Sequence, residues 1–427
     1  MKVLVLGSGA REHAIVKALG ADPAVDAVVV APGNPGMDAV ALCEPLPGGV
    51  SDPASAVEVA RRHAVDLVVV GPEAPLVAGV ADALREAGFA VFGPSAAAAR
   101  LEGSKAFAKD VMAAADVPTG LARVCTTVDE VADALDAMGA PHVVKDDGLA
   151  AGKGVVVTQD REQALEHARA CLAKDGGRVV VEEFLSGPEV SLFCVSDGRT
   201  VLPLAPAQDF KRVGDGDEGP NTGGMGAYSP LDWAPPSLAD EVVTRIAQPT
   251  VEEMARRGTP FVGVLFVGLA LTPRGPRVIE FNARFGDPET QVVLARLTTP
   301  LGGLLHAAAT GTLDEVGALS WSSEHAVTVV VAAANYPATP RTGDPITGIE
   351  DVDDVPTAYV LHAGTGRADD GTLVSAGGRV LSVVALGDSL SQARSRVYEA
   401  VERIALDGSH HRTDIALAAE RNELHVG

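Results

Sequence analysis

The first hundred residues alternate short valine-rich runs with alanine-rich stretches of helical character, and this alternation restricts the fold more than any other feature of the chain. The runs KVLVLG, AVDAVVVAPG, DLVVVGPE and FAVFGPS are separated by REHAIVKALG, by a segment near Pro53 to His63, and by LVAGVADALREAG. Strands buried on both faces read as continuous apolar runs, and helical connections between them give a parallel sheet. We therefore expect a Rossmann-like, doubly wound α/β domain over residues 1–101.

Glycine-containing turns follow the expected strands, at the sheet edge where such folds bind ligands. They are Gly7 to Gly9, Gly33 to Gly36, Gly71 to Glu73 and Gly93 to Ser95. A dinucleotide site is disfavoured, because Glu12 replaces the third glycine of G-x-G-x-x-G and the second strand ends without an acid for a ribose hydroxyl. A nicotinamide-dependent dehydrogenase is therefore not expected. The glycines alone do not distinguish a ligand site from tight turns.

Beyond the first domain the pattern becomes mixed α+β. Strands are expected near His142 to Lys145, Gly154 to Thr158 and Arg178 to Phe184, within a segment that runs from Pro118 to Gly187. A further segment extends to about Gly311. The last hundred residues alternate short strands with turns and end in a helix. We expect a central domain over 102–311 and a C-terminal domain over 325–427, folded as one assembly.

Charge and composition limit the partners. The formal net charge of −23 would repel nucleic acid and anionic membranes, although a few placed cations suffice for a small phosphate ligand. The four cysteines show no metal-ligand spacing, as is usual in a reducing compartment. The N-terminal apolar run is too short for a signal peptide, and FVGVLFVGLAL is too short for a membrane helix. We expect a cytoplasmic, soluble protein that acts on small molecules.

The stretch DGLAAGKG pairs glycines with a lysine but is not a Walker loop. Only three residues separate Gly148 from Gly152, and Gly154 rather than Ser or Thr follows Lys153. Glycines at these positions let a backbone approach a phosphate closely. Lys105 and Lys145 also adjoin a helix start and a strand end, and three lysines so placed favour phosphate binding over solvated surface charges. Metal ligands must then come from elsewhere.

The motif VIEFNAR supplies candidate metal ligands. Glu280 and Asn282 are two residues apart on an expected strand, so they share a face while Ile279 and Phe281 point to the core. Carboxylate and amide oxygens suit Mg²⁺, which takes one or two protein ligands. Arg284 would continue this face and hold a carboxylate. An acid and an amide on a strand also fit a solvent-facing side, and the flanking RFGDPETQ favours the metal site.

A further motif, VVVEEFLSGPEV, is an apolar strand that runs into Glu182 and Glu183, with Glu189 after a Gly-Pro turn. A strand between two lobes offers main-chain groups to an adenine edge, and a carboxylate accepts hydrogen bonds from ribose hydroxyls. A plain strand with a charged exit fits equally well.

Several of these motifs together resemble one family. GSKAFAKD, KDDGLAAGKGVVV, EEFLSGPEVS, QDFKRVGDGDEGPNTGGMGAYSP and VIEFNARFGDPETQ, with MKVLVLGSGAREHA, APGNPG and VGPEAPLVAGV, are similar to the phosphoribosylamine:glycine ligases of the ATP-grasp superfamily. The resemblance extends to turns at Arg341 and His362. It implies two α+β lobes that grip ATP, one of them a mobile lid at about 118–187. It also implies ligation of glycine to 5-phosphoribosylamine through glycyl phosphate in purine biosynthesis.

The resemblance also implies roles for individual residues. The ATP site comprises Lys105, Lys145, Gly152, Lys153, Gly154, Glu182, Glu183, Phe184, Leu185, Glu189, Arg212 and Asn221, with Mg²⁺ or Mn²⁺ on Glu280 and Asn282. The substrate site comprises Gly9, Arg11, Glu12, Gly33, Asn34, Gly71, Pro72, Glu73, Asp209, Lys211, Thr222, Gly223, Gly224, Met225 and Arg284. Lys153 and Arg284 are the expected catalytic residues, and Asp209 and Arg284 are expected to place glycine. We expect a monomer.

Two positions depart from the family pattern. Asp146 stands where a small alanine is expected, which puts a second acid beside Asp147 and close to phosphate; this is electrostatically unfavourable unless Asp146 points away. Phe210 stands where histidine is expected, so it receives no catalytic role. The alternatives are another ATP-grasp ligase or carboxylase of purine synthesis and a non-catalytic nucleotide-binding regulator. A regulator could dispense with the lysines and the metal face, which this chain retains.

Overall fold

The computed structural model describes residues 1–149 and 154–426, and its N-terminal part is built on a parallel sheet. The strand order is β3 (Leu42–Cys43), β2 (Ala27–Pro32), β1 (Lys2–Gly7), β4 (Leu67–Val70) and β5 (Ala90–Phe92), with every neighbouring pair parallel. The Rossmann-like prediction is confirmed. Strand β3 was not predicted, because two residues are too few to give a periodic pattern.

The helices of this domain begin and end where local signals place them. They are α1 (Ala10–Gly20), α2 (Pro53–His63), α3 (Glu73–Val77), α4 (Val80–Glu86) and α5 (Ala96–Gly103). At the start of α2 the Asp52 carboxylate accepts a hydrogen bond from the Ser55 amide, and Pro53 occupies the first turn. At its end Ala64 adopts the left-handed conformation. The predicted span of this helix is confirmed.

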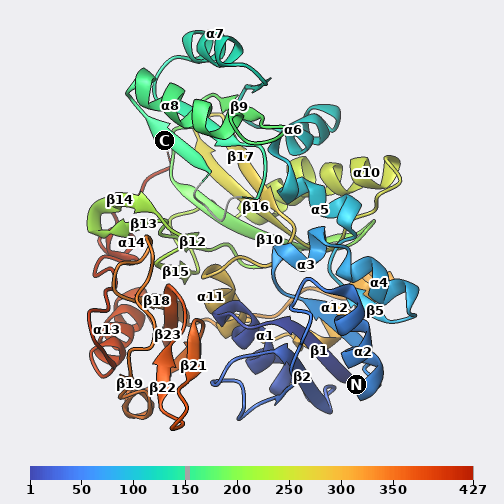
Figure 1. Cartoon of the computed structure of the whole chain (residues 1–427), viewed down its shortest axis with the longest axis vertical. Coiled ribbons are helices and arrows are strands. Elements are labelled where there is room, and N and C mark those ends of the chain that lie inside the picture. Colours follow the sequence, from blue (N-terminus) through green and yellow to red (C-terminus); the bar gives the residue numbers. More distant parts are fainter. Residues whose placement is uncertain (150–153, 427) are drawn as a thin grey trace.

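Residues 118–187, which we call the lid segment, form a small body at the top of Figure 1. Its antiparallel sheet has the order β6 (Ala122–Cys125), β9 (Val179–Glu182), β7 (His142–Asp146) and β8 (Val155–Thr158), covered by α7 (Val128–Met138) and α8 (Arg161–Leu172). Its apolar side chains, among them Leu135, Val144 and Val181, form a cluster separate from the two larger ones.

A second antiparallel sheet forms the fixed part of the centre. Its order is β11 (Val201–Pro203), β10 (Glu189–Asp197), β16 (Val262–Thr272) and β17 (Gly275–Asn282). The accompanying helices are α6 (Lys105–Ala114), α9 (Leu238–Val242), α10 (Gln248–Arg256), α11 (Glu289–Arg296) and α12 (Leu301–Thr310). The long apolar run of the sequence is β16, buried along almost its whole length.

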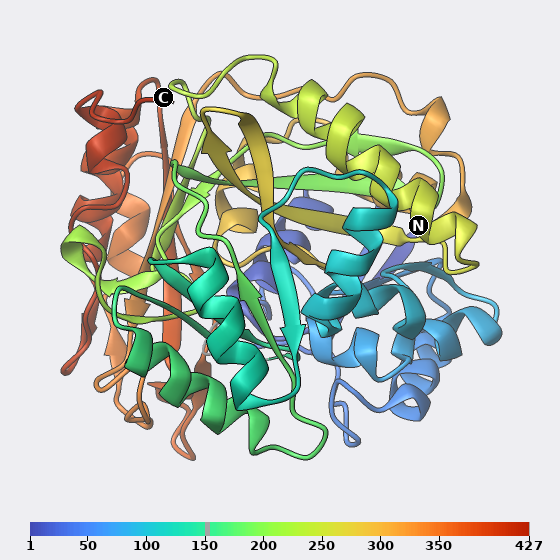
Figure 2. The same ribbon diagram turned by 90° about the horizontal axis from the view of Figure 1, so that it is seen from above.

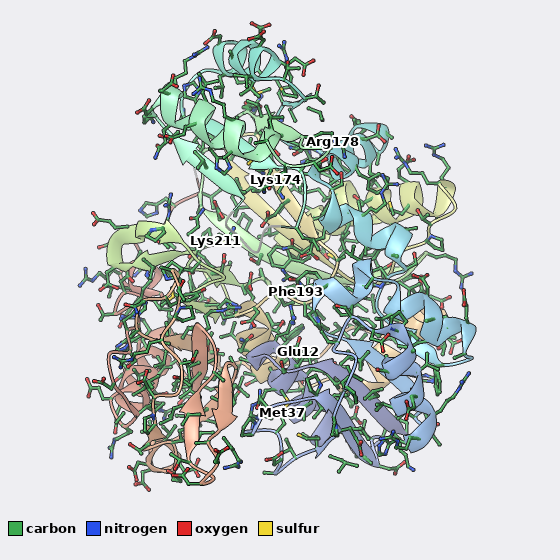
Figure 3. All side chains as sticks on the ribbon, viewed as in Figure 1. Glu12, Met37, Lys174, Arg178, Phe193 and Lys211 are labelled. Carbon is green, nitrogen blue, oxygen red and sulfur yellow. The ribbon has the colours of Figure 1, made fainter. Side chains whose placement is uncertain are left out.

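Phenylalanines join this central sheet to the N-terminal domain. The ring of Phe193, labelled near the middle of Figure 3, lies 5.7 Å from that of Phe266 and 5.5 Å from that of Phe285. Phe285 in turn stacks on Phe92 of β5 at 5.9 Å. Because aromatic side chains bury large areas, these few rings link the two parts firmly.

The third large sheet combines strands from two segments of the chain. Its order is β12 (Gln208–Asp209), β15 (Gly226–Ser229), β18 (His325–Ala332), β23 (Arg379–Gly387) and β20 (Ala358–His362), with α13 (Leu390–Val401) against it. Between β12 and β15 lies the hairpin of β13 (Arg212–Gly214) and β14 (Glu218–Asn221). The central segment therefore contributes two strands to the C-terminal sheet.

Smaller elements complete the C-terminal segment. They are β19 (Ile346–Thr347), β21 (Thr365–Arg367), β22 (Leu373–Ser375), β24 (Ala405–Leu406) and α14 (Leu417–Glu420). The C-terminal segment, in red, and the N-terminal domain, in blue, lie to the two sides of the molecule in both views (Figures 1 and 2). No helix in the described ranges is long and apolar enough to cross a membrane.

Candidate active site

Two of the predicted phosphate-binding lysines lie on elements that meet at the base of the lid segment. Lys105 is the first residue of α6, whose N-cap is Ser104, and its ammonium donates to the Gly148 carbonyl at 3.0 Å. Lys145, on β7, donates to the Ile279 carbonyl at 2.9 Å. Burial lowers the pKa of Lys105, and the nearby Glu280 carboxylate opposes that shift. Gly152 and Lys153 lie outside the described residues, and Gly154 is buried where β8 begins.

The expected metal ligands share a face of β17, but the strand is less regular than predicted. Asn282 and Glu280 pair with Phe266 and Gly268, after which the register shifts at a bulge. Ile279 is the extra residue: it is only half-buried, and Val278 fills the core position. The prediction that Ile279 faces the core is wrong. Strand β17 also ends at Asn282, so Arg284 lies in the following turn and does not continue the face.

Glu280 and Asn282 present oxygens that fit a divalent cation. Within the described ranges, no hydrogen bond or ion pair engages either side chain. Burial alone raises the pKa of Glu280, but the charges of Lys211 and Lys145 and others outweigh it, and the pKa lies below its ordinary value. An ionised carboxylate beside a free amide oxygen is a donor set suited to Mg²⁺.

The residues expected around adenosine lie on the connection that leaves the lid segment. Glu182 is buried and pairs with Lys145 at 3.2 Å, and Glu183 accepts from the Leu121 amide at 3.2 Å. Phe184 is 42% exposed, so its ring is free to contact a ligand. Leu185 lies against Gly120. Glu189 begins β10 and pairs with Lys211 at 2.8 Å, which turns it toward the substrate residues.

Lys109 is a residue that the motif analysis missed. It lies one helical turn after Lys105 on α6, and its ammonium pairs with Glu182 at 2.9 Å. The spacing of four residues places both lysines on one face of a helix, and this signal was present in the sequence.

The two adjacent acids, Asp146 and Asp147, are both neutralised by cations. Asp146 pairs with Lys174 and Asp147 with Arg178 at 2.7 Å, and both cations are labelled in Figure 3. Asp147 also accepts hydrogen bonds from Ser104 and from the Ala106 amide at the start of α6. The negative charge that seemed unfavourable beside phosphate is therefore compensated within the lid segment.

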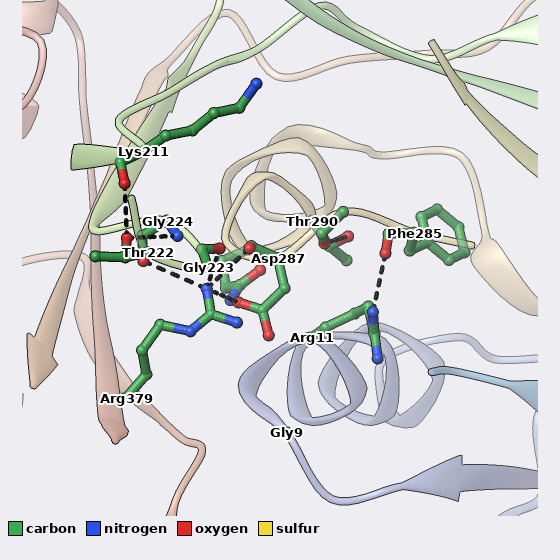
Figure 4. Close-up of polar contacts among 12 residues, drawn as sticks. Gly9, Arg11, Lys211, Thr222, Gly223, Gly224, Phe285, Asp287, Thr290 and Arg379 are labelled. Atoms are coloured by element: carbon green, nitrogen blue, oxygen red, sulfur yellow. Dashed lines mark hydrogen bonds and ion pairs between the residues drawn. The ribbon is translucent and has the colours of Figure 1, made fainter. Parts of the chain in front are cut away.

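The glycine turn of the N-terminal domain encloses the Glu12 side chain. Its carboxylate accepts from the Gly9 amide at 2.7 Å and from Arg11 at 2.5 Å. A Cβ atom on Gly71 would lie 2.2 Å from a Glu12 oxygen, so glycine is required there. The acid thus occupies the positive end of α1, where a dinucleotide fold would bind pyrophosphate. Arg11 also donates to the Phe285 carbonyl at 3.1 Å (Figure 4).

The remaining residues expected near phosphoribosylamine follow β2 and β4. Asn34, after Gly33, donates to the carbonyls of Ser8 and His362 at 2.8 and 2.9 Å, so it joins the N-terminal domain to the C-terminal segment. Pro72 precedes α3, whose first residue is Glu73. Glu73 pairs at 3.2 Å with Arg284.

Arg284 is half-buried and also pairs with Glu102 at 3.0 Å. Burial alone lowers the pKa of Arg284, but Glu102 and Glu73 raise it above its ordinary value. A glycine carboxylate at this arginine would have to compete with both acids. Glu102 is a second residue that the motif analysis missed.

The loop that follows β14 and leads to β15 carries the other predicted substrate residues, several of which appear in Figure 4. Thr222 hydrogen bonds to the Lys211 carbonyl through its amide at 2.7 Å, and its hydroxyl accepts from Gly224 at 3.0 Å. Arg379 of the C-terminal segment donates to the carbonyls of Gly223 and Asp287 at 2.6 and 2.9 Å. The loop is thereby fixed against the turn that follows β17.

The other predicted residues of this region surround that loop. Met225 is buried, and Arg212 pairs across the hairpin with Asn221. Burial raises the pKa of Asp209 to about 7, with Lys211 opposing and Glu289 reinforcing the shift. The ring of Phe210 packs under the Arg412 guanidinium, 4.9 Å from the ring centre. That Phe210 has no catalytic role stays a prediction.

Comparison with known proteins gives a consistent result over the whole chain. The sequence matches three phosphoribosylglycinamide synthetase models: the N domain over residues 1–102, the ATP-grasp (A) domain over 103–290 and the C domain over 326–418. The phosphoribosylamine–glycine ligase of Streptomyces coelicolor is 67% identical, and the alignment covers 98% of this chain and 99% of that one.

Solved structures show the same architecture. The crystal structure of phosphoribosylamine–glycine ligase from Thermotoga maritima superposes with a TM-score of 0.83 at 32% identity, covering 97% of this chain and 100% of that chain. The biotin carboxylase domain of Hydrogenobacter thermophilus 2-oxoglutarate carboxylase, solved with magnesium ADP, has a TM-score of 0.74 at 16% identity, covering 96% and 91% of the two chains. The second likeness concerns the fold alone.

Proposed function

The chain belongs to the phosphoribosylglycinamide synthetase family, and on that premise we propose how its residues divide the reaction. The protein is an ATP-dependent ligase of purine biosynthesis that joins glycine to phosphoribosylamine. The observation that carries our assignment of the site is that Lys105 of α6 and Lys145 of β7 both lie near the Glu280 carboxylate, between the lid segment and the central sheet.

ATP lies between the lid segment and the central sheet, with its phosphates toward Lys105 and Lys145. Lys153, outside the described residues, is proposed to bind the phosphates as well. The adenosine contacts the exit strand of the lid segment, from Glu182 to Leu185. Buried cations bind triphosphate strongly because a low dielectric strengthens each contact. Arg212 and Asn221, which pair across the hairpin, complete the site.

Glu280 and Asn282 would hold Mg²⁺ or Mn²⁺, because an ionised carboxylate and an amide oxygen suit such a cation. The cation would neutralise charge on the phosphates. Other charges at the phosphates are supplied by the lysines of this chain.

The chemistry has two steps. A glycine carboxylate oxygen bonds to the γ-phosphorus as the bond to the ADP oxygen breaks, which gives glycyl phosphate. The amine of phosphoribosylamine then attacks the acyl carbon, phosphate leaves, and the amine loses a proton. Arg284 and Asp209 place the two charged ends of glycine. Excluding water protects the acyl phosphate, which is the role of the lid segment.

Phosphoribosylamine is held by the N-terminal domain, at Gly9, Arg11, Gly33 and Asn34 and at the Gly71 to Glu73 turn. The glycine turns suit a 5′-phosphate, because their backbone can approach a ligand closely. Replacing Asn34 is predicted to weaken binding of this substrate more than binding of ATP. Because Asn34 also bonds to His362, thermal stability must be measured alongside.

Replacement of Glu280 by Gln tests the proposed site. The substitution keeps the size and removes the charge, so turnover should fall on the order of 10² to 10³-fold, the effect of roughly 3 to 4 kcal/mol of lost electrostatic stabilisation. Excess Mg²⁺ should partly restore it. The measurement is a Mg²⁺ titration of ADP formation, with circular dichroism as a folding check.

The exposed Glu58, on α2, provides a matched Glu58→Gln control. If ADP formation depended equally on Mg²⁺ in both variants, Glu280 would not be a metal ligand. If the wild-type protein released ADP equally fast with and without glycine, the glycine-activation step would be contradicted.

A monomeric state and a cytoplasmic location stay predictions.

A further inference from the structure

Lys109 lies where the two connections of the lid segment meet the fixed part of the molecule. Its side chain is only 10% exposed. From α6 its ammonium donates to the Thr119 hydroxyl at 2.8 Å and to the Gly120 carbonyl at 3.3 Å, both on the entering connection. The same ammonium pairs with Glu182, which ends the last strand of the lid, at 2.9 Å.

These connections are also bonded to each other and to the central sheet. The Thr119 hydroxyl donates to the Val278 carbonyl at 2.6 Å, and the Val278 amide donates to Pro118 at 2.8 Å. The Glu183 amide donates to the Leu121 carbonyl at 2.8 Å. Lys109 therefore touches both connections of the lid segment from outside it, and it is the residue that pairs with Glu182 there. Arg277 of β17 also contacts both connections, at the Thr119 carbonyl and at Glu183.

Where the lid connections meet the central part, two ammonium groups share one carboxylate. Glu182 is 4% exposed and lies between two ammonium groups, those of Lys109 and Lys145. Lys145 also lies near enough to Glu280 for its charge to lower the pKa of that carboxyl. If Lys145 turns to a phosphate, Lys109 is the cation of the described residues that stays paired with Glu182. A buried carboxylate without a cation is strongly unfavourable.

We propose that Lys109 is a positioning residue for the ligase reaction: it neutralises Glu182 and holds both lid connections, so that Lys145 is free to bind the phosphates of ATP. Lys109 does not touch the nucleotide itself. This inference rests on the proposed function, because it requires Lys145 to meet the phosphates.

The test is a double-mutant cycle between Lys109→Met and Glu182→Gln, read as KM for ATP. In the Lys109→Met protein, Lys145 stays paired with Glu182, and KM for ATP rises on the order of tenfold, within the usual coupling of buried charges. Turnover at saturating ATP changes less. Adding Glu182→Gln brings KM back toward that of Glu182→Gln alone, because a neutral side chain needs no cation.

Three companion variants make the result decisive. Asp110→Asn, an exposed change on the same helix, leaves KM for ATP unchanged. Lys145→Met raises KM for ATP if the proposed nucleotide site is right, and a normal value there would overturn the proposed function itself. If Lys109→Met does not fold, Lys109→Gln, which keeps a donor for Gly120 but no charge, replaces it in the cycle.

A different pattern would overturn the inference alone. A lowered melting temperature with an unchanged KM for ATP would make Lys109 a purely structural cation. If the fold-change in KM for ATP of the double variant is the product of the two single-variant changes, Lys109 does not act through Glu182.

Discussion

The lid segment carries its own apolar core, whereas the β13–β14 hairpin, which follows Lys211, has none. Leu135, Val144 and Val181 pack within the lid segment, apart from the larger clusters of the molecule. In the hairpin every residue is at least partly exposed. Both carry residues proposed to bind ATP.

The hairpin is fixed by charge from the C-terminal segment. The Arg412 guanidinium, 1% exposed, pairs with Asp217 at 2.7 Å and with Asp414 at 2.6 Å, and it donates to the Arg212 carbonyl at 3.2 Å. Asp414 also accepts from the Gly216 amide at 2.8 Å.

Because only the lid segment has its own core, the two regions differ in how they can change shape. A segment with its own core keeps its structure while it moves as a unit. A hairpin without a core has a defined shape only while its external contacts persist. We therefore expect ATP to reposition the lid segment and to leave the hairpin where it is.

The largest expected effect comes from removing the buried arginine. Arg412→Met leaves Asp414 without its cation, and breaking a buried ion pair costs about 3 to 5 kcal/mol of unfolding free energy. Denaturant unfolding measures the loss, and amide exchange of residues 212–221 should rise. Arg341→Met is the control, because Arg341 also contacts two aspartates, Asp344 and Asp407, but at the surface. Similar losses in both variants would show that burial of Arg412 is not what holds the hairpin.

The second expected effect is protection of the lid segment by nucleotide. A ligand at 100 times its Kd stabilises the binding-competent state by about 2.7 kcal/mol, so amide exchange in residues 118–187 should slow on the order of 100-fold. Exchange in 212–221 should change far less. Hydrogen exchange with and without a non-hydrolysable ATP analogue measures both segments in one experiment. Equal protection of residues 118–187 and 212–221 would contradict the expectation that ATP repositions the lid segment and leaves the hairpin in place.

A smaller effect is expected at the foot of the hairpin, from Asp209. Because its pKa is raised to about 7, this acid is protonated below that pH and charged above it. A charged Asp209 attracts the ammonium of glycine, so KM for glycine should fall roughly tenfold between pH 6 and pH 8. Steady-state assays across this range test it, with Asp209→Asn expected to flatten the profile. A KM that rises with pH would contradict the assignment.

The smallest effect is expected from Lys174→Ala. Lys174 neutralises Asp146 but is itself 61% exposed, and pairs of this kind contribute at most about 1 kcal/mol. KM for ATP should therefore rise only a few-fold, because Asp146 then repels the phosphates slightly. Adding Asp146→Ala should restore the original value. A large loss that Asp146→Ala does not restore would show that Lys174 itself binds the nucleotide.

The parts of the fold that were predictable from sequence are those with a local signal. Helix α2 has an N-cap, a proline and an apolar period within its own residues, and β1 and β4 are continuous apolar runs. The bulge at Ile279 has no such signal, since strict alternation and alternation with one inserted residue differ by a single position. Because the bulge comes before Glu280 and Asn282 in the chain, the predicted position of Ile279 is wrong, whereas Glu280 and Asn282 still share a face.

The site was less predictable where partners are distant in sequence. Arg412 contacts Asp217 from nearly the other end of the chain, and nothing near either residue indicates the pair. Asp146 seemed unfavourable because Lys174 lies beyond the intervening helix. Lys109 had a usable signal in its spacing from Lys105, but a lone lysine on a helix is ordinarily a surface residue. Such contacts depend on tertiary packing.

The mixed origin of the C-terminal sheet has a consequence for dissecting the protein. A fragment beginning near residue 326 would lack β12 and β15, and the buried strand β18 would become an open sheet edge. Exposed apolar edges of this kind pair with other chains, so such a fragment is expected to aggregate on expression. A fragment ending near residue 311 would leave β15 paired with β12 but without β18. To obtain stable fragments, the chain would have to be divided so that residues 208–229 stay with the C-terminal strands.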